Sequence, residues 1–330
     1  MKKYHSIRNL VLDLENMEDL KPFGEFNKEL VPLLEILEKI NPCNQEYELA
    51  DDAIVISYFL KLNLFNFKGI FPLRMKVQII GLPISMSGKG YWGEEASIQK
   101  IIQERKGLKV LLNGNPGFEN AGRTLSTFVF ENRFPTFGDY LNALRSPYRR
   151  RIRQALDHRE DLGIRVLDRK NFAQNHYKLY LSIMLRTENL LEILPIEFFR
   201  DYDAELYEFI NIRSEEIMGF IQIKEMAGKL YFLFCGFEKK ESRVHDLYYN
   251  MLLKIIEIGI EKQVESIEFG QTSEESKLKI GCREIPKYLY AHSSNPVWNW
   301  VVQLLIPAFS YKPYTLKHNV FKQEPDKVRR

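Results

Sequence analysis

The chain has 330 residues, of which 45% are hydrophobic and 28% are charged. This balance is typical of a globular protein that can bury a sizeable core, and the length suggests about two domains or one large one. A disordered chain, a collagen-like repeat and a coiled coil are excluded. Lys+Arg 47 against Asp+Glu 44 leaves a net charge of only +3, whereas histone-like or ribosomal nucleic-acid binders are far more basic.

Cysteine and histidine usage gives no sign of a disulfide framework or a metal site. Cys43, Cys235 and Cys282 are widely spaced without a CxxC pair, and the six histidines show no ligand spacing, so we predict no metal and a reducing compartment. No apolar run of spanning length occurs, and we expect a cytoplasmic protein. The most apolar late segment, Val297–Phe309, is interrupted by Pro307; it predicts a packed C-terminal helix or, alternatively, a segment on a membrane surface.

Hydrophobic periodicity and turn residues predict alternating helices and strands in both halves of the chain. In the first half we expect helices at 26–40 and 94–107, and strands at 53–67, 75–85, 109–117 and 124–134. In the second half we expect helices at 136–144, 148–162, 172–189, 195–207 and 247–263, and strands at 164–167, 208–212, 217–226, 229–237 and 266–270.

An internal repeat links the two halves. The segment QKIIQERKGLKVLLNG has a counterpart in LKIIEIGIEKQVESIEFG, so that Lys100 corresponds to Lys254 and Gly114 to Gly270. Each copy contains paired strands, a central strand, a loop, a helix and a following strand, and such domain-sized self-similarity indicates two copies of one architecture. We therefore predict an N-terminal domain at 1–134 and a C-terminal domain at 135–330.

A glycine-rich turn precedes the helix of the first copy. Gly88, Gly90 and Gly93 match GxGxxG literally, and a loop at a helix N-terminus can hold a phosphate. The dinucleotide fingerprint also requires an acidic residue about 20 positions later, where this chain has Asn113 and Gly114. A flexible turn, a phosphate cradle and, more remotely, dinucleotide binding stay open as interpretations.

Three motifs in order resemble Fem-type transferases, the peptidoglycan-bridge aminoacyltransferases of the GNAT superfamily. LRSPYRRRIRQALDHREDLGIRVL resembles their arginine-rich "RxxIRxA" helix, and LYLSIMLRTENLLEILPIEFFRDY their next helical stretch. IEFGQTSEESKLKIG resembles their "DFGRS…FKxxxG" signature, although Glu268 replaces the aspartate and Ser276 the aromatic residue. The resemblance covers roughly residues 136–290. It implies an α/β protein of tandem GNAT-like domains, each a mixed, partly splayed β-sheet flanked by helices.

The resemblance implies acyl transfer to an amine. The implied donor is an aminoacyl-tRNA, an acyl-CoA or an acyl carrier protein, used as a co-substrate without a tightly bound cofactor, and the acceptor is an amine on a small metabolite or cell-wall precursor. The loop GFEKKESRVHDLYY lacks the "Q/RxxGxG" acyl-CoA signature of ordinary GNAT enzymes. Fem-type members also lack this signature. The alternative is a non-catalytic GNAT-derived module that binds RNA or a nucleotide-linked ligand.

The candidate catalytic residues lie in the second half. Glu268 could accept the proton of the amine, directly or through water, or be a solvated residue at a strand end. Lys277 could hold a carboxylate, a phosphate or the developing oxyanion, or be a surface lysine. Tyr249 could act as a general acid or pack in the core.

The candidate donor-binding residues are mainly basic. Arg243 and His245 could bind phosphate at the N-terminus of the helix that follows them, although Asp246 more simply caps that helix. Four arginines of one helix could hold RNA or another phosphate-bearing donor, or form a solvated face. The predicted donor-binding set also includes the two residues that follow the "EFG" turn. The four arginines are Arg149, Arg150, Arg151 and Arg153, and the two residues after the "EFG" turn are Gln271 and Thr272.

Overall fold

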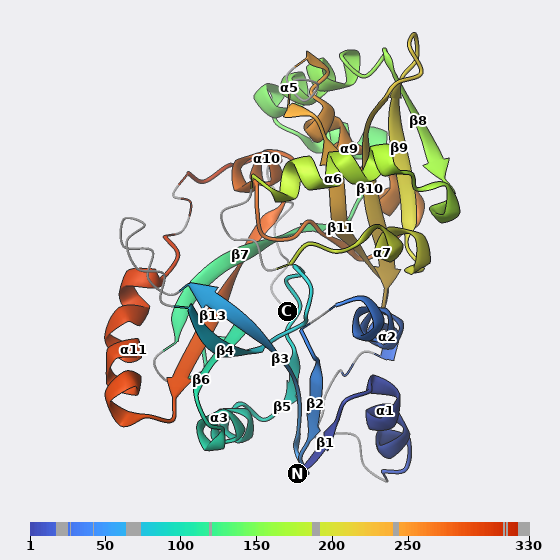
Figure 1. The fold of residues 1–330 in the computed structure, drawn as a ribbon. Coiled ribbons are helices and arrows are strands. Elements are labelled where there is room, and N and C mark those ends of the chain that lie inside the picture. Colours follow the sequence, from blue (N-terminus) through green and yellow to red (C-terminus); the bar gives the residue numbers. More distant parts are fainter. Residues whose placement is uncertain are drawn as a thin grey trace. The chain divides into compact units, whose positions relative to one another are not determined.

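The computed structural model describes residues 1–17, 26, 28–41, 43–63, 74–118, 121–186, 192–239, 244–312, 314 and 316–322. The chain forms two compact units (Figure 1), of which the first comprises Met1–Ser126 with Pro286–Pro313 and the second Thr127–Ile285 with Tyr314–Arg330. Residues 286–313 thus pack with the first unit, whereas the division inferred from the sequence assigned them to the second. Along the described residues, no helix combines the length and apolar character that crossing a bilayer requires.

The first unit is a mixed sheet with helices. Its strand order is β1 (Lys2–Tyr4), β2 (Glu46–Leu49), β3 (Ala53–Asn63), β4 (Arg74–Ile80), β6 (Leu108–Gly114) and β13 (Arg283–Ser293), with β5 (Tyr91–Gly93) paired to β3. The pair β4–β6 is parallel and is connected through α3 (Glu95–Glu104). The other helices are α1 (Ile7–Glu15), α2 (Val31–Ile40), which follows the short η2 (Lys28–Leu30), and α11 (Pro296–Phe309).

The second unit repeats this plan. Its strand order is β7 (Gly122–Glu131), β12 (Ser266–Glu268), β11 (Lys229–Phe237), β10 (Ile217–Met226), β9 (Glu205–Asn211) and β8 (Leu162–Leu167). Here β11 and β12 are the parallel pair, and α9 (Leu247–Glu261) connects them. The flanking helices are α4 (Phe137–Ala143), α5 (Ser146–Asp157), η3 (Arg169–Asn171), α6 (Gln174–Met184), α7 (Ile196–Asp201) and α10 (Glu274–Lys279).

Both units therefore contain an antiparallel meander whose last strand is followed by a helix and then by a strand parallel to it, as the internal repeat predicts. The strand after each repeat passes into the other unit. β7 follows β6 in the chain, yet its end pairs with β12, while β13 follows β12 and pairs with β6. The predicted α/β architecture, with mixed β-sheet flanked by helices, is confirmed.

Helix α9 forms the centre of the core of the second unit. Its sequence LYYNMLLKIIEIGIE is apolar nearly all round, and Met251, Leu252, Leu253, Ile255 and Ile256 are fully buried. A helix of this kind is covered on all sides, unlike a surface helix with one apolar stripe. Each such side chain contributes about 1.5–3 kcal/mol on burial, so packing fixes α9 against the sheet.

The glycine-rich turn of the first unit is packed against the sheet. Residues 91–93 form β5, and the carbonyl of Gly90 accepts a hydrogen bond from Ile56 N at 2.8 Å. Gly93 has φ +115°, and a Cβ there would collide with the carbonyl oxygen of Asp52, which explains why glycine occupies this position. Helix α3 then begins with Glu95 in its first turn, a charge that disfavours an anion at this N-terminus.

Candidate active site

The parallel strands β11 and β12 separate after three paired residues. Lys229–Tyr231 pair with Ser266–Glu268, and β11 then continues to Phe237 without β12 beside it. The chain after β12 stays with β7, because Phe269 N donates to Phe128 O at 2.9 Å and Phe128 N donates to Gly270 O at 3.1 Å. The gap that the sequence predicts between these strands is present.

A β-bulge in β11 explains the separation. Phe232 pairs with Ile223 of β10 and Phe234 with Gln222, which leaves Leu233 as the extra residue. A bulge bends its strand and increases the local twist. This one comes directly after the last pair between β11 and β12, so it turns β11 away from β12. In the first unit, by contrast, β4 stays paired with β6 up to Ile80.

Lys277 of α10 is the most unusual ionisable residue near this gap. Its side chain is only 2% exposed, and its ammonium lies 5.8 Å from the centre of the Phe128 ring. Within the described part of the chain, its Nζ atom makes no hydrogen bond or salt bridge. Burial lowers the pKa of Lys277 to about 8. Charged and neutral forms of this amine therefore exchange near physiological pH.

Two cysteines lie near Lys277 but do not neutralise it. Burial raises the pKa of the Cys235 thiol to about 12, and burial also raises the pKa of Cys282, with Lys277 acting in the opposite direction in both cases. Both therefore stay protonated at neutral pH and are poor nucleophiles. Cys282 also donates its backbone N–H to the carbonyl of Lys277 at 3.1 Å, which fixes the turn after α10.

Two carboxylates act on Lys277 from a distance. The charges of Glu274 and Glu268 each favour its ammonium form without forming a salt bridge to it. Glu274 lies in the first turn of α10, where burial raises its pKa, and Glu284 adds to that effect. Glu268 is half-buried at the end of β12. The structure thus brings the predicted pair Glu268 and Lys277 to the same region.

Tyr249, the third predicted catalytic residue, is buried on α9. Its hydroxyl has no hydrogen-bond partner among the described residues, and the Arg151 guanidinium lies 4.8 Å from its ring. Cys282 perturbs both Tyr249 and Lys277, so the two residues share a neighbour. The neighbouring Tyr248 is hydrogen bonded to the Ser273 side chain, and its ring lies 5.5 Å from that of Phe237 on β11.

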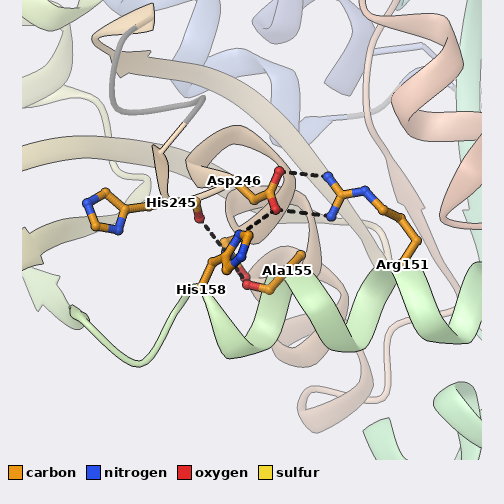
Figure 2. A network of polar contacts seen from close by, with 6 residues as sticks. Arg151, Ala155, His158, His245 and Asp246 are labelled. Carbon is orange, nitrogen blue, oxygen red and sulfur yellow. Dashed lines mark hydrogen bonds and ion pairs between the residues drawn. The ribbon is translucent and has the colours of Figure 1, made fainter.

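The N-terminus of α9 holds an ion pair (Figure 2). Arg151 donates from Nη1 and Nη2 to the two Asp246 carboxylate oxygens at 3.1 and 2.6 Å, and His158 Nδ1 lies 2.9 Å from Oδ2. Asp246 is the N-cap residue of α9, as the sequence predicts, but its carboxylate accepts no hydrogen bond from the helix. Asn250 Nδ2 instead donates to the carbonyls of Ala155 (2.7 Å) and His245 (3.0 Å).

The predicted donor-binding residues are dispersed. Arg243 lies outside the described residues. His245 is half-buried, and its ring points away from Asp246 (Figure 2). On α5, Arg150 and Arg153 are exposed and Arg149 is half-buried, and none of the three forms a salt bridge to a described residue. Gln271 and the exposed Thr272 lie between β12 and α10. No described contact connects the three arginines to Lys277.

No protein-family model matches the chain, and no curated protein matches its sequence. Several solved structures do match. FemX is 11% identical with a TM-score of 0.53, and the match covers 92% of this chain and 100% of that chain. The chain has the tandem GNAT-like fold of FemX.

Two further structures have the same fold. L-PGS from Bacillus licheniformis is 14% identical with a TM-score of 0.51, covering 92% of this chain and 97% of that chain. The C-terminal domain of a putative lysylphosphatidylglycerol synthetase from Agrobacterium fabrum is 11% identical with a TM-score of 0.52, covering 84% and 91%. The Fem-type resemblance of the motifs is therefore confirmed for the fold.

Proposed function

We propose that the chain is an N-acyltransferase that moves an acyl or aminoacyl group from an activated donor to an amine acceptor. The reaction is placed in the gap between β11 and β12 of the second unit. The observation that carries the proposal is Lys277, a buried amine that forms no salt bridge with any described residue and lies near the point where the two strands separate. A strongly perturbed ionisable group of this kind is typical of functional sites.

Lys277 stabilises the oxyanion that develops when the amine attacks the acyl carbonyl. A pKa of about 8 leaves most of the side chain charged at pH 7. Because no carboxylate of the described residues forms a salt bridge with it, its charge is available to the transition state, and the low-dielectric surroundings strengthen the interaction. Glu268 accepts the proton that the attacking amine loses. Tyr249, whose hydroxyl lacks a described partner, supplies a proton to the leaving group.

The N-terminus of α9 supports a donor other than acyl-CoA. The Asp246 carboxylate is held there by Arg151 and places a negative charge where the helix would otherwise attract a diphosphate. Aminoacyl-tRNA and an acyl carrier protein remain as donor classes, with the acceptor an amine on a small metabolite or cell-wall precursor. The alternative function is a non-catalytic module for RNA or a nucleotide-linked ligand.

A matched pair of lysine variants on α10 tests the proposal. Lys277→Met keeps the aliphatic stem of the buried residue and removes its charge, while Lys279→Met removes a half-exposed lysine that pairs with Glu275. Transfer of labelled acyl groups from a panel of aminoacyl-tRNAs, acyl-CoAs and acyl carrier proteins to amines is measured for both. We expect Lys277→Met to lose at least about 100-fold in rate and Lys279→Met to match the wild type. Full transfer by Lys277→Met would overturn the proposal, and donor binding without transfer by the wild type would support the non-catalytic module.

A further inference from the structure

Helix α11 presents an apolar outer face to solvent. Val297, Trp298, Trp300 and Leu304 are 71%, 43%, 65% and 58% exposed. Positions 297, 300 and 304 recur at helical spacing, so their side chains form one stripe. Contiguous exposed apolar residues on one element are unusual in a protein that only meets water, and they mark interaction surfaces.

The opposite face of α11 is fixed to its own unit (Figure 1). Asn299 Oδ1 accepts a hydrogen bond from Ser293 N at 2.9 Å, and Gln303 Nε2 donates to Ala291 O at 2.9 Å. Ile306 is buried near Gly122, and Arg123 N donates to Ser310 Oγ at 3.2 Å. Rotating the helix to hide its outer face would break all of these contacts, so the stripe is held outward.

The sequence around α11 has an unusual charge pattern. Residues 288–311 contain no Asp, Glu, Lys or Arg, and the longer stretch 285–323 contains four lysines and no acidic residue. The whole chain, in comparison, has a net charge of only +3. Of the four, Lys287 and Lys312 belong to the same unit as α11 and flank it in the chain, whereas Lys317 and Lys322 belong to the other unit. An uncharged apolar helix flanked by lysines complements a surface that is apolar inside and negatively charged outside.

We propose that α11 binds in the plane of a lipid bilayer that contains anionic lipids, with its outer face in the headgroup region. Trp298 and Trp300 of the outer face prefer this interfacial zone, and the flanking Lys287 and Lys312 add attraction to anionic headgroups. The 14 residues of α11 are too few to span a hydrocarbon core of about 30 Å.

Vesicle flotation of the full chain tests this inference, using phosphatidylcholine vesicles with and without phosphatidylglycerol. We expect flotation with the phosphatidylglycerol vesicles, together with a blue shift of tryptophan emission. The shift reports on α11 because the third tryptophan, Trp92, is already buried. The variant Trp300→Gln/Leu304→Gln should lose at least about tenfold in vesicle binding. The control Val166→Gln, which changes an exposed apolar residue of β8, should bind like the wild type.

Three results would overturn the inference: no flotation with either vesicle, equal flotation of the double variant, or a wild-type dimer that the double variant converts to a monomer. The last result would assign the stripe to a second copy of the chain. Thermal unfolding of the double variant should match the wild type, since both side chains are exposed. The inference is independent of the proposed acyl transfer, because Lys277→Met should float like the wild type.

Discussion

Tyr231 of β11 pairs with Glu268 of β12, and this is the last pair the two strands make. Directly after it, the bulge at Leu233 turns β11 aside, while β12 continues along β7. The carboxylate of Glu268 thereby lies at the closed end of the gap, and its charge acts on the buried amine of Lys277. One local irregularity in the sheet thus explains where the candidate site forms.

The buried charge of Lys277 should destabilise the fold at neutral pH. Its pKa is about 8 in the folded chain against an ordinary 10.5, so between these values the unfolded chain binds more protons and stability rises with pH. The penalty is fully present below pH 8 and amounts to about 3 kcal/mol. We expect Lys277→Met to be more stable than the wild type in urea at pH 7, with a smaller advantage at pH 10. A variant less stable than the wild type at pH 7 would contradict this.

The network of Figure 2 should depend more on its buried amide than on its ion pair. Asn250 is fully buried and donates two hydrogen bonds, so Asn250→Ala should lose about 1–3 kcal/mol of unfolding free energy. Arg151 is partly exposed, and solvent screens its pair with Asp246. Arg151→Met should therefore lose at most about 1 kcal/mol. Urea unfolding of both variants tests the order, and the reverse order would show that the charges hold α5 to α9.

A glycine of β11 should be essential for the packing of α6. A Cβ on Gly236 would meet Tyr180 N at 2.6 Å and Leu179 C at 2.7 Å, and backbone atoms cannot yield as a flexible side chain does. Gly236→Ala should cost about 1–3 kcal/mol. Gly138 of α4 has room, with Thr136 Oγ1 3.5 Å from the added Cβ, so Gly138→Ala should gain about 0.5–1 kcal/mol. Equal melting temperatures for the two variants would refute the close approach of α6.

Local sequence signals predicted much of the fold. The Thr136–Asp139 spacing indicates a capped helix, and Asp139 N donates to Thr136 Oγ1 at 3.1 Å. The helix predicted at 195–207 is wrong beyond Asp201, because residues from Glu205 onward pair with β10 and β8 as strand β9. Pairing with distant strands determines the conformation of that segment, and the local sequence pattern does not reveal such pairing. The predicted break at Pro307 is also absent, since α11 continues through it.

The candidate site was only partly predictable. Glu268 and Lys277 could be found because they stand in a motif that resembles a family signature. The bulge at Leu233 could not, since the extra residue is defined only by its register with β10. The position of Cys235 beside Lys277 also depends on tertiary packing, because these two residues are far apart in the sequence. The pairing of Arg151 with Asp246 likewise requires α5 and α9 to be in contact.

The pH dependence of acyl transfer, measured in single-turnover reactions of the wild type and Lys277→Met, tests the central claim most directly. If the ammonium of Lys277 stabilises the oxyanion, the wild-type rate should fall as pH rises through about 8, because the side chain loses its charge. The rate of Lys277→Met should be low and should lack that transition. A wild-type rate that increases through pH 8, or a Lys277→Met variant that keeps both the rate and the transition, would contradict the assignment.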